Sequence, residues 1–148
     1  MTAQTSLYDQ DYYLWSQKMA NLLRSQQWDQ LDIDNIAEEI ESLGKSDRRS
    51  LKSNLIVLIM HLLKWQYQPE KRTNSWKVTI REHRQRVKDL LQDSPSLKSF
   101  MEENLETIYR LSCDQAVDET GLATSHFPQT CPYTPDQVLD EGFLPNGT

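Results

Sequence analysis

Two carboxylates and one imidazole are the residues of this sequence whose types and spacing best suit a metal site. Glu38 and Glu41 are three positions apart, so on a helix their side chains share one face. If their helix packs antiparallel to the helix of His61, or across a kink from it, the three side chains can bind iron, manganese or zinc. The Glu-x-x-His pair of di-iron bundles is missing, however. The simpler interpretation is that Glu38 and Glu41 lie on a solvated acidic face and that His61 lies at the edge of the core.

A second group of residues combines cations with large aromatic side chains around the predicted turn at 66–72. Aromatic faces beside Lys and Arg bind single-stranded nucleic acid or the anchor residue of a protein partner. The same residues also suit a helical hairpin that covers its own loop. The candidate binding residues are Lys64, Trp65, Tyr67, Trp76, Lys77, Arg81 and Arg84.

Common catalytic motifs are absent from the sequence: it has no glycine-rich phosphate loop, nucleophile elbow or His-Glu-x-x-His pair. A nucleophilic cysteine needs a base or a cation that lowers its thiol pKa, and only His126 lies near Cys131. We interpret Phe127, Cys131 and Tyr133 instead as part of an aromatic and proline clasp over a helical bundle. We therefore assign no catalytic residue and favour a protein that is not an enzyme.

Helices are the elements that would position these residues, because apolar side chains recur along the chain at helical spacing. Residues 55–63 are apolar almost all round the helix circumference, which is typical of a helix surrounded by others. The predicted helices cover residues 8–25, 35–43, 47–67, 76–92 and 95–120.

Capping signals set the expected ends of the inner helices. Asp34 should cap the helix over 35–43, and Gly44 should end or kink it. Asn74 or Ser75 should cap the helix over 76–92. The expected inward face of the helix over 35–43 consists of Ile36, Ala37, Ile40 and Leu43.

The last long helix has the clearest boundaries. Ser94 followed by Pro95 is a typical helix start, and Gly121 is a typical end. Beyond it, Thr134 should cap a short helical turn at 135–140.

Composition limits the fold class. Hydrophobic residues make up 37% of the 148 residues, too many for a disordered chain, and only four glycines are available for the tight turns of an all-β fold. We expect an all-α, single-domain bundle of about five helices over residues 1–121. An irregular, proline-containing tail over residues 122–148 should wrap around it.

Charge is unevenly distributed along the chain. The formal net charge is −6, but residues 64–88 carry a net +6 between an N-terminal part of −3 and a C-terminal part of −9. The negative net charge of the whole chain argues against indiscriminate nucleic-acid binding by its whole surface. The basic segment either meets an anionic partner or lies against the acidic helix of its own chain.

The sequence begins without the basic and apolar regions of a signal peptide, and the apolar run at 55–63 is shorter than the ~20 residues that span a bilayer. We expect a cytoplasmic protein that does not enter a membrane. Cys113 and Cys131 match no zinc or redox spacing, so two free thiols are expected there.

Several stretches form a specific pattern that covers the chain from Tyr8 to Pro145. They are LDIDNIAEEIESLG at 31–44, HLLKWQYQPE at 61–70, SW at 75–76, TIRE at 79–82, DSPSL at 93–97, FP at 127–128 and CPY at 131–133. In these stretches the chain resembles the bacterial family catalogued as domain of unknown function 29. The resemblance implies an all-helical fold and brings no established activity, cofactor or catalytic residue.

Two functional hypotheses follow. The leading one is a non-enzymatic binding or regulatory module for a macromolecular partner, with a protein as the expected partner and nucleic acid as a second candidate through residues 64–88. It requires no cofactor. The alternative is a hydrolase-like enzyme that depends on a divalent metal held by Glu38, Glu41 and His61. A homo-oligomer that uses part of the apolar helix over 47–67 is a third interpretation.

Overall fold

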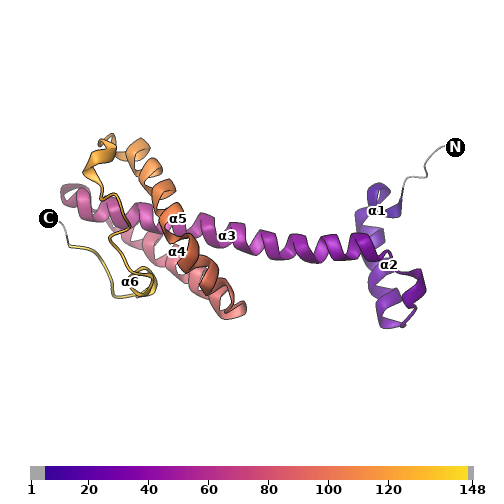
Figure 1. The fold of residues 1–148 in the computed structure, drawn as a ribbon. Helices are drawn as coiled ribbons and strands as arrows, with labels where there is room; N and C mark the ends of the chain where they lie inside the picture. Colours follow the sequence, from indigo (N-terminus) through magenta and orange to yellow (C-terminus); the bar gives the residue numbers. More distant parts are fainter. Residues whose placement is uncertain (1–5, 147–148) are drawn as a thin grey trace. The chain divides into compact units, whose positions relative to one another are not determined.

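The computed structural model describes residues 6–146, and these contain six α-helices and no strand (Figure 1). The prediction of an all-α fold is confirmed. No helix among the described residues is long and apolar enough to cross a membrane. The helices are α1 (Leu7–Gln10), α2 (Tyr12–Arg24), α3 (Ile33–Tyr67), α4 (Asn74–Asp93), α5 (Leu97–Thr120) and α6 (Pro135–Leu139), with 3₁₀ helices at Trp28–Gln30, Pro69–Lys71 and Thr124–His126.

The chain forms two compact units, the first ending at Ser46 and the second beginning at Asp47. The expectation of one domain over residues 1–148, divided into a bundle and a tail, stays a prediction.

The first unit has a small core of its own, in which Trp15, Met19 and Leu22 of α2 are buried. Polar side chains attach α1 and α2 to the start of α3. The indole Nε1 of Trp15 donates to Asp32 at 3.1 Å, and the hydroxyl of Tyr12 donates to Glu39 at 2.6 Å. The hydroxyl of Tyr8 donates to the same carboxylate.

The predicted helix over 8–25 is wrong in one respect, because it is two helices. Asp11 ends α1 and caps α2, where its carboxylate accepts the backbone N–H of Leu14 at 3.0 Å. A side chain that captures a free N–H of the first turn favours a new helix start over continuation of the old one.

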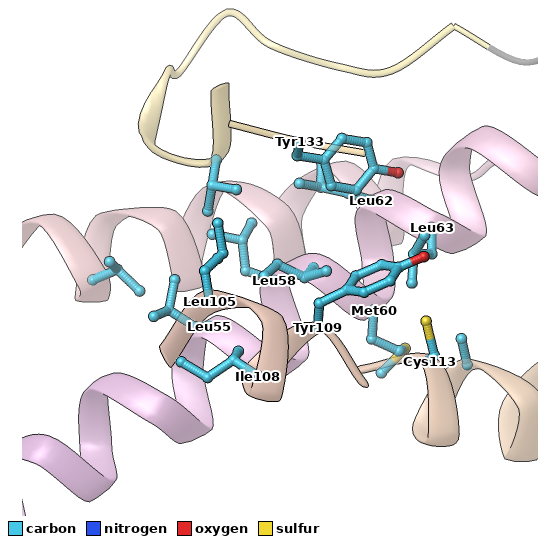
Figure 2. Packing of buried hydrophobic residues seen from close by; sticks show 14 of the residues in the cluster. Leu55, Leu58, Met60, Leu62, Leu63, Leu105, Ile108, Tyr109, Cys113 and Tyr133 are labelled. Carbon is cyan, nitrogen blue, oxygen red and sulfur yellow. The ribbon is translucent and has the colours of Figure 1, made fainter. Parts of the chain in front are cut away.

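The second unit is built around the C-terminal half of α3, as its all-round apolar character predicts. Figure 2 shows Leu55, Leu58 and Leu62 of α3 beside residues of α5 and Tyr133 of the C-terminal segment. The α3 side chains that have no solvent exposure are Leu51, Leu55, Leu58, Ile59, Leu62 and Leu63.

The separate helices predicted over 35–43 and 47–67 are one continuous helix, and Gly44 lies inside it. A glycine within a helix costs only about 0.5–1 kcal/mol relative to alanine, which good helix-forming neighbours can offset. Asp34, the predicted cap, is therefore in the first turn of the helix. Ile40 and Leu43, predicted to be buried, are 63% and 69% exposed.

The boundaries of the later helices differ from the predictions by a few residues. Thr73 caps α4 through its side chain. The predicted start of the last long helix at Ser94 is wrong, because Ser94 is the C-terminal cap of α4. Pro95 then lies in a turn before α5. Two signals are confirmed: Gly121 ends α5 in the left-handed conformation (φ 72°), and Thr134 caps α6 in a capping box with Gln137.

Replacing Gly44 by alanine should strengthen the middle of α3, because nothing lies within 4 Å of a Cβ placed there. The expected gain of about 0.5–1 kcal/mol corresponds to amide hydrogen exchange about two- to fivefold slower around residue 44. Hydrogen–deuterium exchange with mass spectrometry measures it. Unchanged or faster exchange in the Gly44→Ala protein would contradict a helical Gly44.

Candidate functional site

A pocket of about 380 Å³ lies between α4 and the C-terminal segment of the second unit. α4 contributes residues at positions 77, 80, 81, 84 and 85, which share one side of a helix. The segment that follows α6 supplies a carboxylate and an aliphatic side chain. The lining residues are Lys77, Ile80, Arg81, Arg84, Gln85, Glu141 and Leu144.

The core determines which side of α4 faces this pocket. Ile80 and Val87 are buried in the main core of the second unit, and α6 lies beside α4 (Figure 1). The neighbouring positions Lys77 and Arg81 consequently remain exposed. Gln85, one turn after Arg81, is exposed as well.

Arg84 joins α4 to the C-terminal segment and is only 2% exposed. Its Nε donates to the carbonyl of Val138 at 2.8 Å, and its Nη2 donates to the carbonyls of Phe143 at 3.1 Å and Gln137 at 3.4 Å. Burial lowers the pKa of Arg84, while the charges of Asp140 and Glu141 act in the opposite direction. These hydrogen bonds hold the wall of the pocket in place.

Positive charge dominates the pocket. Glu141 is its only acidic lining residue, and Lys88 pairs with this carboxylate at 3.2 Å. Neither of the two ion pairs found among the described residues involves Lys77, Arg81 or Arg84. Lys77 instead places its Nζ 5.5 Å from the ring centre of Trp65. Two exposed cations and one buried guanidinium therefore face a common space.

The structure divides the seven predicted binding residues into two groups. Lys77, Arg81 and Arg84 line the pocket, although Arg84 is buried rather than solvated. Sequence reasoning did not identify Glu141 or Leu144, because nothing local to the C-terminal segment indicates that it meets α4.

The other four predicted residues pack inside the second unit. Lys64 is buried, forms an ion pair with Glu119 at 2.7 Å and lies 4.7 Å above the ring centre of Trp76. Trp65 is 8% exposed, and the guanidinium of Arg72 covers its ring at 4.8 Å. Tyr67 is half-buried, with its ring edge-on to that of Phe127. These aromatic faces are already occupied by the chain itself.

The structure does not contain the helix packing that the predicted metal site requires. It needs two helices that fold against each other, whereas Glu38, Glu41 and His61 all belong to α3. Glu38 and Glu41 are exposed and belong to the first unit, and His61 belongs to the second. Residues 6–146 hold no group of three His, Cys, Asp or Glu side chains arranged to bind a metal ion.

His61 is half-buried, and its Nδ1 lies 2.9 Å from the carbonyl of Val57. Nδ1 donates in this contact, so Nε2 is the basic nitrogen. Burial lowers the pKa of His61. The charges of Lys64 and His83 lower it further, and that of Glu119 opposes them.

The two cysteines are free thiols in the structure, as predicted. Cys113 is buried in the main core, and burial raises the pKa of Cys131 to about 11. The Cys131 thiol donates to the carbonyl of Tyr133 at 3.3 Å. A thiol with such a high pKa is a poor nucleophile at neutral pH. The clasp interpretation fits this segment, since Phe127 and Tyr133 are both buried.

Comparison with known protein families identifies the family of this chain. The model of the family Domain of unknown function DUF29 matches residues 7–144, nearly the whole chain. The chain belongs to the DUF29 family. No curated protein and no solved structure matches significantly. The DUF29 match covers both the residues of α4 that line the pocket and the segment that closes it.

Arg84→Met should destabilise the second unit by about 2–4 kcal/mol, because one buried and two partly buried carbonyls lose their charged donor. Chemical denaturation followed by circular dichroism measures the loss. Arg81→Met, at an exposed position on the same helix, is the control and should change the unfolding free energy by less than about 0.5 kcal/mol. Equal losses in the two proteins would contradict the structural role of Arg84.

Protonation of His61 should destabilise the fold, because its pKa is lower in the folded chain than the ordinary value of 6.5. The neutral imidazole contributes its stabilisation fully above about pH 6.5, and this is lost as the pH falls towards the folded pKa. Melting temperatures between pH 7.5 and 5.5 test this. His61→Gln should flatten the curve and the exposed control His126→Gln should not; equal slopes would contradict the assignment.

Proposed function

We propose that this DUF29 protein is a non-enzymatic module that binds an acidic segment of a protein partner in the α4 pocket. The observation that carries the proposal is the convergence of Lys77, Arg81 and Arg84 on one pocket with apolar walls. Cations and aliphatic side chains together are suited to binding an anionic ligand that also carries an apolar group.

The cations of the pocket suit a carboxylate ligand. Arg81 is exposed and presents a planar guanidinium that can bind both oxygens of a carboxylate. Lys77 lies one turn before it on the same face and adds a second positive charge. Arg84 adds a positive charge at the wall of the pocket, and its Nε and Nη2 already donate to carbonyls. An Asp or Glu side chain at the mouth of the pocket would therefore meet two donors.

The walls of the pocket suit an apolar side chain beside that carboxylate. Ile80 is buried and Leu144 is half-buried, and both contribute to the lining. The volume of about 380 Å³ is at the lower end of the range for ligand pockets. A partner segment that places an aliphatic residue next to Asp or Glu would use both features.

A protein partner is favoured over nucleic acid by the positions of the aromatic rings. Proteins that bind single strands present aromatic faces on which bases stack. Trp65 is buried under Arg72, and Lys64 lies over the ring of Trp76. The lining of the pocket contains no aromatic residue.

A labelled peptide of alternating Glu and Leu, titrated with the protein in fluorescence anisotropy, tests the proposal. Arg81→Glu should weaken binding about tenfold or more, because it replaces attraction by repulsion at the mouth of the pocket. Lys98→Glu changes the net charge equally at an exposed position outside the pocket and should leave the affinity unchanged.

The same titration with a labelled oligothymidylate decides the class of partner. Tighter binding of the oligonucleotide than of the peptide would overturn the proposal, as would absence of peptide binding. Equal weakening by Arg81→Glu and Lys98→Glu would show that net charge alone attracts the peptide, and would overturn it too. Circular dichroism of each variant establishes that the fold is intact.

A further inference from the structure

A second pocket, of about 500 Å³, lies between α5 and the segment that follows it. It belongs wholly to the second unit and shares no lining residue with the pocket at α4. α5 contributes positions 109, 110, 113 and 114, which share one side of a helix, and the facing wall consists of residues between 124 and 129. The volume lies within the range of small-molecule sites. We call this hollow the α5 pocket.

Hydrogen bonds from α5 hold the facing wall of the α5 pocket in place. The hydroxyl of Tyr109 donates to the carbonyl of Pro128 at 2.7 Å. A few residues further on, both carboxylate oxygens of Glu106 accept the backbone N–H of Cys131 at 3.1 Å. The pocket is therefore formed in the absence of a ligand, and binding does not have to order its wall.

The floor of the α5 pocket is mainly apolar. Tyr109, Cys113 and Phe127 belong to the main core and also line the pocket, and the half-buried Pro128 completes this surface. A polar group placed on such a floor would lose hydrogen bonds with water and regain none. The floor therefore suits an aliphatic or aromatic part of a ligand.

Two opposite charges lie at the rim of the α5 pocket. Arg110 and Asp114 are exposed lining residues, one turn apart on α5. Opposite charges four positions apart on a helix can pair with each other, but the order with the cation first is the weaker one. Neither ion pair found in residues 6–146 involves Arg110 or Asp114. One positive and one negative charge are therefore available to a ligand.

The facing wall adds neutral polar groups to this rim. Thr124, Ser125 and Gln129 line the α5 pocket and are exposed. Hydroxyl and amide groups can each donate and accept hydrogen bonds. The charged end of a ligand held by α5 would therefore find further partners on the opposite side.

We propose that the α5 pocket binds a free α-amino acid that has an apolar side chain. The planar guanidinium of Arg110 binds the carboxylate of the amino acid, since it can donate to both oxygens. The carboxylate of Asp114 accepts hydrogen bonds from the ammonium group. The apolar side chain of the ligand lies on the floor formed by Tyr109, Cys113, Phe127 and Pro128.

A free amino acid is the ligand class that uses every part of this pocket. Its two charges are attached to one carbon, which suits two side chains whose Cβ atoms are about 5–6 Å apart on adjacent helix turns. A simple carboxylic acid would leave Asp114 without a partner, and a simple amine would leave Arg110 without one. Inside a peptide chain both charges are lost to amide bonds. This inference does not depend on the pocket at α4.

Titration of the full chain with L-phenylalanine, followed by heteronuclear NMR of the backbone amides, tests the proposal. Saturable shifts should be concentrated at residues 109–114 and 124–129. Phenethylamine lacks the carboxylate and hydrocinnamate lacks the ammonium group, so each should bind about tenfold or more weakly than L-phenylalanine. Arg110→Met should weaken L-phenylalanine about tenfold without weakening phenethylamine. Asp114→Asn should weaken L-phenylalanine to a similar extent without weakening hydrocinnamate.

The controls are Lys98→Met and Asp118→Asn, which remove the same charges at exposed positions of α5 outside the pocket and should leave the affinity unchanged. Circular dichroism establishes that each variant is folded. Absence of L-phenylalanine binding, or shifts confined to other residues, would overturn the proposal. So would analogues that bind as tightly as the amino acid, or control variants that weaken binding as much as Arg110→Met and Asp114→Asn.

Discussion

Burial of the C-terminal half of α3 is the constraint on which the second unit depends. Its leucines and Ile59 have no solvent exposure, and each such side chain stabilises the fold by about 1.5–3 kcal/mol when fully buried. A helix that is apolar almost all round must be covered on several sides. α4, α5 and the C-terminal segment provide this cover, with Val87, Ile108 and Tyr133 among the buried residues.

The pocket at α4 results from the way in which α4 and the C-terminal segment cover α3. Because Ile80 and Val87 face the core, the next side of α4 meets the C-terminal segment, where Arg84 binds three backbone carbonyls. A guanidinium can satisfy several carbonyls that have no helix or strand partner, which an irregular segment needs when it is buried. The same arrangement leaves Lys77 and Arg81 at the opening. A residue that stabilises the fold and two that face solvent thus form one charged surface.

The two exposed surfaces of this chain differ in their physical character. At α4, cations surround a hollow with aliphatic walls, which suits a short acidic segment. On α3, exposed apolar residues lie beside charges of both signs. The net charge of −6 reveals neither, because it averages over segments of opposite sign.

The sequence by itself determined the features that depend on neighbouring residues. Helical spacing of apolar residues established the all-α fold and the apolar centre of α3, and local caps at Gly121 and Thr134 were predicted correctly. Such signals act within one or two turns of a helix. Gly44 was ambiguous because one glycine costs too little to decide between a break and a continuous helix.

Contacts between distant parts of the chain, and the exposure of each helix face, depended on the tertiary structure alone. Lys64 pairs with Glu119, and Arg84 binds residues more than fifty positions later in the chain. No spacing along the sequence indicates such contacts, because they depend on how the helices pack. An arginine in a basic helix is normally solvated, and burial becomes favourable only where carbonyls from elsewhere satisfy its donors. For the same reason, the exposure of Ile40 and Leu43 could not be read from their helical spacing: that spacing defines a face, and only packing decides what covers it.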